Sequence, residues 1–304
     1  MSGRRLFAGP ARRAAVAPLL WMLLFFLLPF GFVLKISLSH TVIAQPPYLP
    51  VFDLTAGVAA IKAAFAALSL ENFRLLISDD LYVLSYLRSV TVALIATAIL
   101  IAIGYPIAYG MSRLPRRWQP IAMMLVIVPF WTSFLIRIYA WINILQHDGL
   151  LNKVLLALHV VSAPVVWLST DTAMYLGIVY SYLPFMILPL YATLAKMDSS
   201  LLEAAADLGS SRLQAFWLVT FPLSLPGIAA GALLCFIPIV GEFVIPDLLA
   251  GSDSPMIGQT LWLEFFTNRD WPVASAIATV LLVLLVAPLL VYDRLQRRQL
   301  EARR

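Results

Sequence analysis

The chain has 304 residues, of which 62% are hydrophobic and 12% charged, and its mean hydropathy is +0.90. A soluble domain is about a quarter charged, so this composition excludes a water-soluble protein and indicates one embedded in lipid. The net charge of +5 does not indicate nucleic-acid binding, because the basic residues flank apolar runs, and the single cysteine, Cys235, excludes a disulfide framework.

Six apolar stretches are long enough to cross a membrane, which takes about 20 residues. The first follows several arginines, as in a signal peptide, but its apolar run is too long and no small-residue cleavage site follows closely. The sequence therefore predicts a single all-α integral membrane domain, residues 1–304, with six transmembrane helices. They are expected at residues 17–38, 88–111, 119–145, 172–195, 222–250 and 273–292.

The basic residues predict the orientation of these helices. Most of the 21 Lys and Arg fall on one side if both termini face the cytoplasm, whereas the opposite loops are rich in Asp and Glu. This distribution follows the positive-inside rule. Cytoplasmic N- and C-termini are therefore expected.

The segment of about residues 39–87 is then a long outside loop. It contains the proline-rich run from Pro46 to Pro50, followed by an alanine-rich piece, Leu54 to Leu68, that is expected to form an interfacial helix. Two interpretations stay open. The loop is either a structured cap on the membrane surface or a docking platform for a soluble partner.

The third stretch is rich in aromatic residues. Trp131, Tyr139 and Trp141 fit either a cage for a cation or an aromatic belt at the membrane interface. Arg137, in the same stretch, is expected to pair with an acidic neighbour rather than to contact a cation. The tyrosines of the fourth stretch, Tyr175, Tyr180 and Tyr182, fit a belt or helix packing.

The inside loop of about residues 197–222 carries the most detailed local signals. Ser200 with Glu203, and Ser211 with Gln214, each have the spacing of a capping box, and Gly209 suits a left-handed helix end. The sequence predicts two short helices joined at Gly209, with the second closing before Pro222.

These residues resemble a known signature. Glu203-Ala204-Ala205, then Gly209, then Val219-Thr220-Phe221-Pro222 is similar to the cytoplasmic loop of ATP-binding-cassette (ABC) importer permeases, with Val219 and Phe221 replacing the usual Ile and Leu. The resemblance implies a type I importer permease fold. In that family the loop supplies a coupling helix that sits in a cleft of an ATPase subunit, with Glu203 as a polar contact and Gly209 as the turn.

No phosphate-binding P-loop motif occurs in the sequence. The chain is therefore expected to be a transport subunit rather than an enzyme, and to bind no cofactor itself. ATP and magnesium would be bound by a separate ATPase dimer.

The fifth stretch contains the clearest intramembrane charge, Glu242, between Pro238 and Pro246. Such residues are costly in lipid and indicate function, and a broken helix is tolerated where it lines a cavity. Glu242 is expected to face the substrate pathway, with Asp247 nearer its mouth. The alternative is a structural ion pair between Glu242 and Arg137. Nearby, Gly227-x-x-x-Gly231 predicts close helix packing.

Three runs resemble the spermidine/putrescine branch of this permease family, closest to the larger putrescine-type subunit. The resemblance implies a polyamine importer of the bacterial cytoplasmic (inner) membrane, with a second permease and an extracytoplasmic binding protein as partners. Relatives in this branch handle other small organic cations, amino-acid derivatives or ferric ion, so these substrates stay open. The runs are residues 129–141, 241–249 and 264–276.

Other classes fit less well. An ion-coupled secondary transporter would show repeated hydropathy halves and would not need a capped coupling loop. A channel would show a glycine-rich filter segment. A membrane enzyme is also disfavoured, because the three histidines, His40, His147 and His159, have no metal-site spacing.

Overall fold

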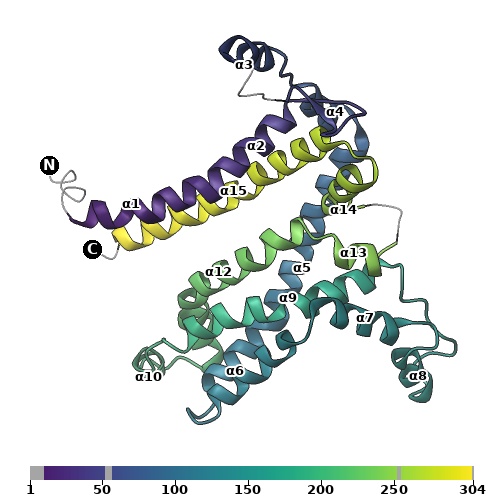
Figure 1. The fold of residues 1–304 in the computed structure, drawn as a ribbon. Coiled ribbons are helices and arrows are strands. Elements are labelled where there is room, and N and C mark those ends of the chain that lie inside the picture. Colours follow the sequence, from purple (N-terminus) through teal and green to yellow (C-terminus); the bar gives the residue numbers. More distant parts are fainter. Residues whose placement is uncertain (1–9, 52–56, 252–254, 303–304) are drawn as a thin grey trace. The chain divides into compact units, whose positions relative to one another are not determined.

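The computed structural model describes residues 10–51, 57–251 and 255–302 (Figure 1). Within these ranges the regular structure is helical apart from one two-stranded hairpin. The chain divides into two compact units, described separately here. Unit 1 comprises Met1–Val83 and Leu261–Val283, and unit 2 comprises Leu84–Thr260 and Leu284–Arg304.

Unit 1 begins with the first expected span. It consists of α1 (Pro10–Met22), a π turn over Leu23–Leu27 and α2 (Leu28–Ser37). Side chains from Val16 to Pro29 are all exposed. A helix this apolar and this exposed requires lipid or other helices around it, not water.

The segment between the first two spans is folded. Strands β1 (His40–Thr41) and β2 (Tyr48–Leu49) pair antiparallel, and helices α3 (Gly57–Ala66) and α4 (Glu71–Ser78) follow. The expected helix start at Leu54 lies outside the described residues.

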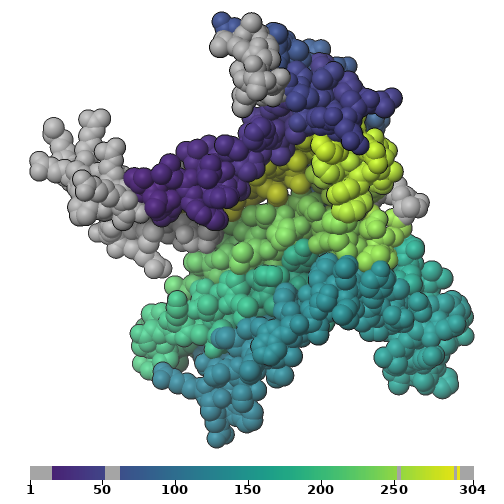
Figure 2. Space-filling view, in the orientation of Figure 1, coloured from purple at the N-terminus to yellow at the C-terminus, as the bar shows by residue number. Residues whose placement is uncertain are grey.

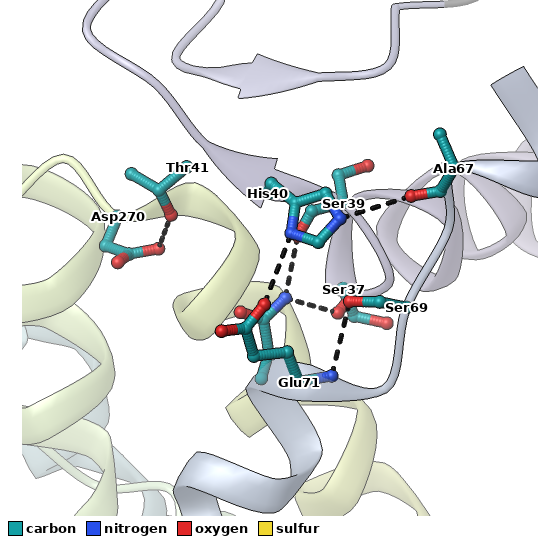
Figure 3. A network of polar contacts seen from close by, with 9 residues as sticks. Ser37, Ser39, His40, Thr41, Ala67, Ser69, Glu71 and Asp270 are labelled. Atoms are coloured by element: carbon teal, nitrogen blue, oxygen red, sulfur yellow. Dashed lines mark hydrogen bonds and ion pairs between the residues drawn. The ribbon is translucent and has the colours of Figure 1, made fainter.

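A polar network fixes this segment to the end of α2 (Figure 3). The amide of Asn72, on α4, donates hydrogen bonds of 2.8 Å to the carbonyls of Ser37 and Ser39. His40 lies 3.4 Å from Glu71, and Thr41 donates a 2.6 Å hydrogen bond to Asp270. The segment is therefore folded and hydrogen-bonded to the residues beside it. Its place as a cap on the membrane surface and its use as a docking platform both stay predictions.

Unit 2 is built around α5 (Asp80–Arg113), α9 (Asp171–Leu194) and α12 (Phe221–Val240). Glycines bring α12 close to α9. A Cβ on Gly227 would lie 2.5 Å from the hydroxyl of Thr193, and one on Gly231 would lie 2.8 Å from the sulfur of Met186. The predicted close packing through Gly227 and Gly231 is therefore confirmed.

This packing makes a stability prediction. Gly227→Val should lower the free energy of unfolding by about 1–3 kcal/mol, because the added methyl groups overlap Thr193 and the Pro189 carbonyl. Gly110→Val is a matched control, since a Cβ on Gly110 meets nothing within 4 Å. Thermal unfolding in detergent should separate the two variants. Equal stability of both would contradict the packing.

The third expected span, 119–145, is not one helix, and this expectation was wrong. α6 (Gln119–Ile127) passes into a 3₁₀ turn (Val128–Trp131), and α7 (Phe134–Leu145) and α8 (Leu150–Ala157) follow. The two halves of the span are bent by 89°. Pro129 lacks a backbone donor, and Thr132 is extended, so the helical hydrogen bonds cannot continue.

The first, fourth and sixth spans lie at Val16–Ser37, Asp171–Leu194 and Trp271–Leu290, within two residues of expectation. The second and fifth spans differ from expectation at one end. α5 begins at Asp80 rather than near residue 88, and α12 ends at Val240 rather than near residue 250. Short helices α13 (Val244–Leu249) and α14 (Ile257–Trp262) follow, then a π turn over Leu263–Thr267 and the long helix α15 (Trp271–Ala302).

Among the described residues, five helices are long and apolar enough to cross a membrane, or six if the bent pair is one span. The chain is thus a helical membrane protein with the expected spans, the third of which is broken. The expectation of one membrane domain stays a prediction.

Candidate functional site

The loop after α9 forms a capped helix with a sharp turn. α10 (Ser200–Asp207) ends at Gly209, whose φ is +80°. The Gly209 amide donates to the Ala206 carbonyl at 2.8 Å, and the Ser210 amide donates to the Ala205 carbonyl at 3.0 Å. These two bonds define a Schellman motif, in which only glycine takes the left-handed position without strain. The predicted left-handed turn at Gly209 is confirmed.

One predicted capping box is present and the other is absent. Ser211 and Gln214 cap each other's backbone amides, at 3.3 and 2.9 Å. Ser200 and Glu203 do not form a box, because α10 is capped one residue earlier, at Ser199. Glu203 therefore stands at the fourth helical position, out of reach of the N-cap amide.

Asp198 supplies a side-chain acceptor for a free backbone amide at the start of α10. The Ser200 amide donates to its carboxylate at 3.0 Å. Hydrogen bonds from Ser200, that of the backbone amide foremost, hold the pKa of the Asp198 carboxyl below its usual value. The Glu203 side chain is exposed and can contact a partner.

The second helix of the loop was expected to end before Pro222, but it continues past this residue. α11 (Arg212–Ala215), a π turn (Phe216–Thr220) and α12 form one continuous helix. Pro222 has no amide to donate, and it stands just after the π turn, in the first turn of α12. Wide π turns of this kind accommodate a missing donor inside a helix.

The surface of this loop is partly apolar. In the space-filling view the loop stands at the surface of unit 2 (Figure 2). Leu208 is 87% exposed and Leu213 is 68% exposed, while Ala205 is buried beneath Glu203 and Ala204, which are both exposed. Large exposed apolar side chains beside a free carboxylate are typical of a protein-docking surface.

Glu242 lies in the turn between α12 and α13. The hydroxyl of Tyr182, on α9, donates to its carboxylate at 2.5 Å. The amides of Val244 and Ile245 donate to the other carboxylate oxygen at 3.1 and 3.4 Å. The amides at the N-terminus of a helix favour a negative charge. All of these donors are neutral.

Arg137 does not pair with Glu242. Ion pairs in the described part of the chain include His40–Glu71, Arg88–Asp171 and His147–Asp148, and none joins Arg137 to Glu242. The guanidinium of Arg137 instead lies 4.5 Å from the ring centroid of Phe130, and its Nε and Nη1 atoms are buried without a hydrogen-bond partner. The bend after the 3₁₀ turn places Arg137 against the aromatic ring that precedes it. The expected acidic partner of Arg137 was therefore wrong.

The other candidate pathway residues are spread out. Trp131 and Tyr139 are exposed, while Trp141 packs edge-on against Tyr180 with ring centroids 5.5 Å apart. Across the residues that the structure describes, no ring contact joins Trp131, Tyr139 and Trp141. Asp247 is exposed on α13. Tyr182 is the site residue that the sequence placed only in a belt or packing role, since nothing local in the sequence pairs it with Glu242, 60 residues away.

Comparison with known proteins identifies a family and several similar proteins. The family described as "Binding-protein-dependent transport system inner membrane component" matches residues 100–300. The spermidine/putrescine transport system permease protein PotB of Escherichia coli (strain K12) is 42% identical over 229 residues, covering 75% of this chain and 83% of that protein. PotB of Haemophilus influenzae is also 42% identical, over 227 residues, which are 75% and 79% of the two chains.

Proteins of lower identity that resemble this chain are also parts of ABC transporters. The inner membrane ABC transporter permease protein YdcU of Escherichia coli (strain K12) is 32% identical over 240 residues, or 75% of this chain and 76% of that one. A chain of a bacterial ABC transporter involved in the import of alginate has the same fold, with a TM-score of 0.69 at 15% identity and 95% of each chain covered. A chain of the MetNI methionine ABC transporter in an inward-facing conformation has a TM-score of 0.54 at 16% identity, with 72% of this chain and 95% of that chain covered.

Proposed function

This chain belongs to the family of binding-protein-dependent transport system inner membrane components, and we propose from that premise that it forms half of a membrane pathway for polyamines. The 42% identity to the spermidine/putrescine permeases over three quarters of the chain carries the proposal. Polyamines would be delivered by an extracytoplasmic binding protein. A second permease would supply the other half of the pathway.

ATP hydrolysis would take place on a separate ATPase dimer. The capped helix α10, with exposed Glu203 and Leu208, supports a docking role for this loop. Closure of the two ATPase subunits would move α10, and α10 would transmit that movement to α9 and α12, which flank it in the chain. The rival class, an ion-coupled secondary transporter, has no use for such a loop.

The chemistry at Glu242 suits a cationic substrate. Its carboxylate receives only neutral donors, the Tyr182 hydroxyl and two backbone amides. An ammonium group can replace the hydroxyl donor and add a charge that the neutral donors lack, which strengthens a hydrogen bond about twofold. Another small organic cation, an amino-acid derivative or ferric ion would be the alternative substrate.

The orientation is part of the proposal. α10 would face the cytoplasm of a bacterium, as would both termini, and the cap that contains β1 and β2 would face outward. Reporter fusions at both termini and at Ala60 test this. An external terminus, or an internal Ala60, would contradict it.

The decisive experiment is uptake by the reconstituted complex. The chain, the second permease, the ATPase and the binding protein would be placed in vesicles with radiolabelled putrescine, spermidine or an amino acid. We expect polyamines to stimulate ATP hydrolysis and to accumulate only with ATP. Accumulation that needs an ion gradient instead of ATP would contradict an importer, and stimulation by amino acids alone would contradict the substrate.

A further inference from the structure

A partly open pocket lies in unit 2, at the base of α10. Its volume is about 150 Å³, and it is bounded by the last turns of α5 and α9, the start of α10 and the π turn that precedes α12. The side of α10 that touches it carries Leu202, and the exposed Ser199 precedes the helix there. Nine residues line it: Tyr109, Ser112, Arg113, Leu194, Ala195, Met197, Ser199, Leu202 and Thr220.

Thr220 is an unsatisfied donor in this wall. The residue is 1% exposed, and its hydroxyl has no hydrogen-bond partner. Helical Ser and Thr normally bond a carbonyl one turn earlier, as Thr193 does with Pro189 at 2.9 Å and Ser224 with Phe221 at 2.7 Å. Thr220 ends the π turn and makes no such bond. A buried hydroxyl left without a partner is costly. Among the described residues the hydroxyls of Thr97, Ser181 and Thr220 are in this state, and of the three only Thr220 lines this pocket.

The charge of the wall is positive. Arg113 is the one Asp, Glu, Lys or Arg among the nine lining residues. Its guanidinium lies 5.1 Å from the ring centroid of Tyr109, which also lines the space, and it makes no ion pair with the described residues. The nearby Lys196 and Asp198 alternate with the lining residues and do not line the wall.

The C-terminal ends of α5 and α9 border the pocket and carry the negative ends of the helix dipoles, so a bound anion depends on the side-chain donors. Three backbone carbonyls at these ends already have donors. The side-chain amide of Gln119 donates to the carbonyls of Ser112 and Leu114, at 3.4 and 3.0 Å. The Met197 amide donates to the Leu194 carbonyl at 3.2 Å. The Ser112 hydroxyl also donates, to the Tyr109 carbonyl at 2.8 Å. The donors left to bind a ligand are therefore the Arg113 guanidinium and the hydroxyls of Tyr109, Ser199 and Thr220.

We propose that this space binds a phosphate group. A guanidinium and hydroxyls are donors that phosphate oxygens accept readily, and a pocket of about 150 Å³ has room for one tetrahedral anion. A phospholipid headgroup and free phosphate share this chemistry. A bound phosphate would join α10 to the ends of α5 and α9, and so would stiffen the loop.

Binding can be measured on the purified full chain without any transport assay. Delipidated protein would be mixed with dioctanoyl phosphatidylglycerol, with inorganic phosphate, or with dioctanoylglycerol, which has the same acyl chains and no phosphate. Native mass spectrometry would count bound molecules, and the melting temperature would report stabilisation by ligand. We expect one phosphate-bearing molecule per chain. Binding of the lipid alone, or of free phosphate as well, identifies the source.

Two substitutions and a matched control decide the site. Thr220→Val keeps the side-chain volume and removes the hydroxyl, and Arg113→Gln removes the charge. Each should weaken binding about tenfold or more, because a hydrogen bond to a charged group is lost. Arg116→Gln removes an exposed arginine of the same region that does not line the space, and it should bind as the wild type does.

The outcomes do not depend on transport activity. No bound phosphate-bearing probe, equal binding of dioctanoylglycerol, or binding unchanged in both variants would overturn the proposal. An empty space also predicts that Thr220→Val is simply more stable, with no probe-dependent change in melting temperature in either protein. The effect on substrate-stimulated ATP hydrolysis rests on the proposed function, and its failure alone would count against coupling rather than against binding.

Discussion

Glu242→Gln should lower polyamine uptake by about 10- to 100-fold while the protein assembles normally. The amide oxygen can still accept from Val244 and Ile245, and its NH₂ group can donate to the Tyr182 hydroxyl. The substitution therefore keeps the hydrogen bonds and removes only the charge. A charged hydrogen bond contributes about 1.5–3 kcal/mol, and about 1.4 kcal/mol corresponds to a tenfold change. Uptake by reconstituted vesicles measures the effect.

Controls for this prediction come from the same chain. Asp148→Asn removes an exposed carboxylate that lies outside the candidate pathway, and it should leave uptake unchanged. Because Arg137 contacts an aromatic ring and not Glu242, Arg137→Gln should not rescue Glu242→Gln. Normal uptake by Glu242→Gln would remove this residue from the pathway. Loss of assembly, restored by Arg137→Gln, would revive the ion pair.

Gly209→Val should uncouple ATP hydrolysis from substrate while membrane insertion stays normal. A Cβ on Gly209 meets nothing within 4 Å, so steric contact with neighbours has no part in the effect. The cost comes from the backbone, because φ is +80° and a left-handed conformation costs an L-residue about 1–2 kcal/mol. Relief of that strain would break the Schellman motif and turn α10 away from its present direction.

The matched control is Gly209→Asn. Asparagine tolerates left-handed conformations far better than a β-branched residue does, so it should retain most of the coupling. ATP hydrolysis by the reconstituted complex, with and without loaded binding protein, measures both variants. If Gly209→Val is stimulated by substrate as the wild type is, this loop is not the coupling element.

The sequence predicted the turn at Gly209 and the first helix start of the loop to within one residue. Gly209 and the Ser211–Gln214 box were predicted from residue type and spacing alone, since both depend on hydrogen bonds within a few residues. The Ser200–Glu203 box failed because the helix is capped at Ser199. A shift of one residue moves a side chain by about 100° around the helix, which is enough to break a reciprocal cap.

The bend in the third span has a local signal in the sequence, which hydropathy does not detect. Pro129, followed by Thr132 and Ser133, interrupts the apolar run. Hydropathy averages over a window of about 19 residues and is insensitive to one missing donor. The backbone responds to that single donor, and the span breaks there.

The sequence by itself determined the membrane class, the number of apolar spans and the turn at Gly209. A bilayer demands long apolar segments, and a helix end is set by its own neighbours. Only the tertiary structure decided that Tyr182 meets Glu242, that Arg137 lies against Phe130, and that Arg113 and Thr220 line one pocket. The Tyr182–Glu242 hydrogen bond joins residues 60 positions apart, and the pocket brings Arg113, at the end of α5, near Thr220, just before α12. Such meetings depend on how helices pack, as α9 and α12 do through small residues.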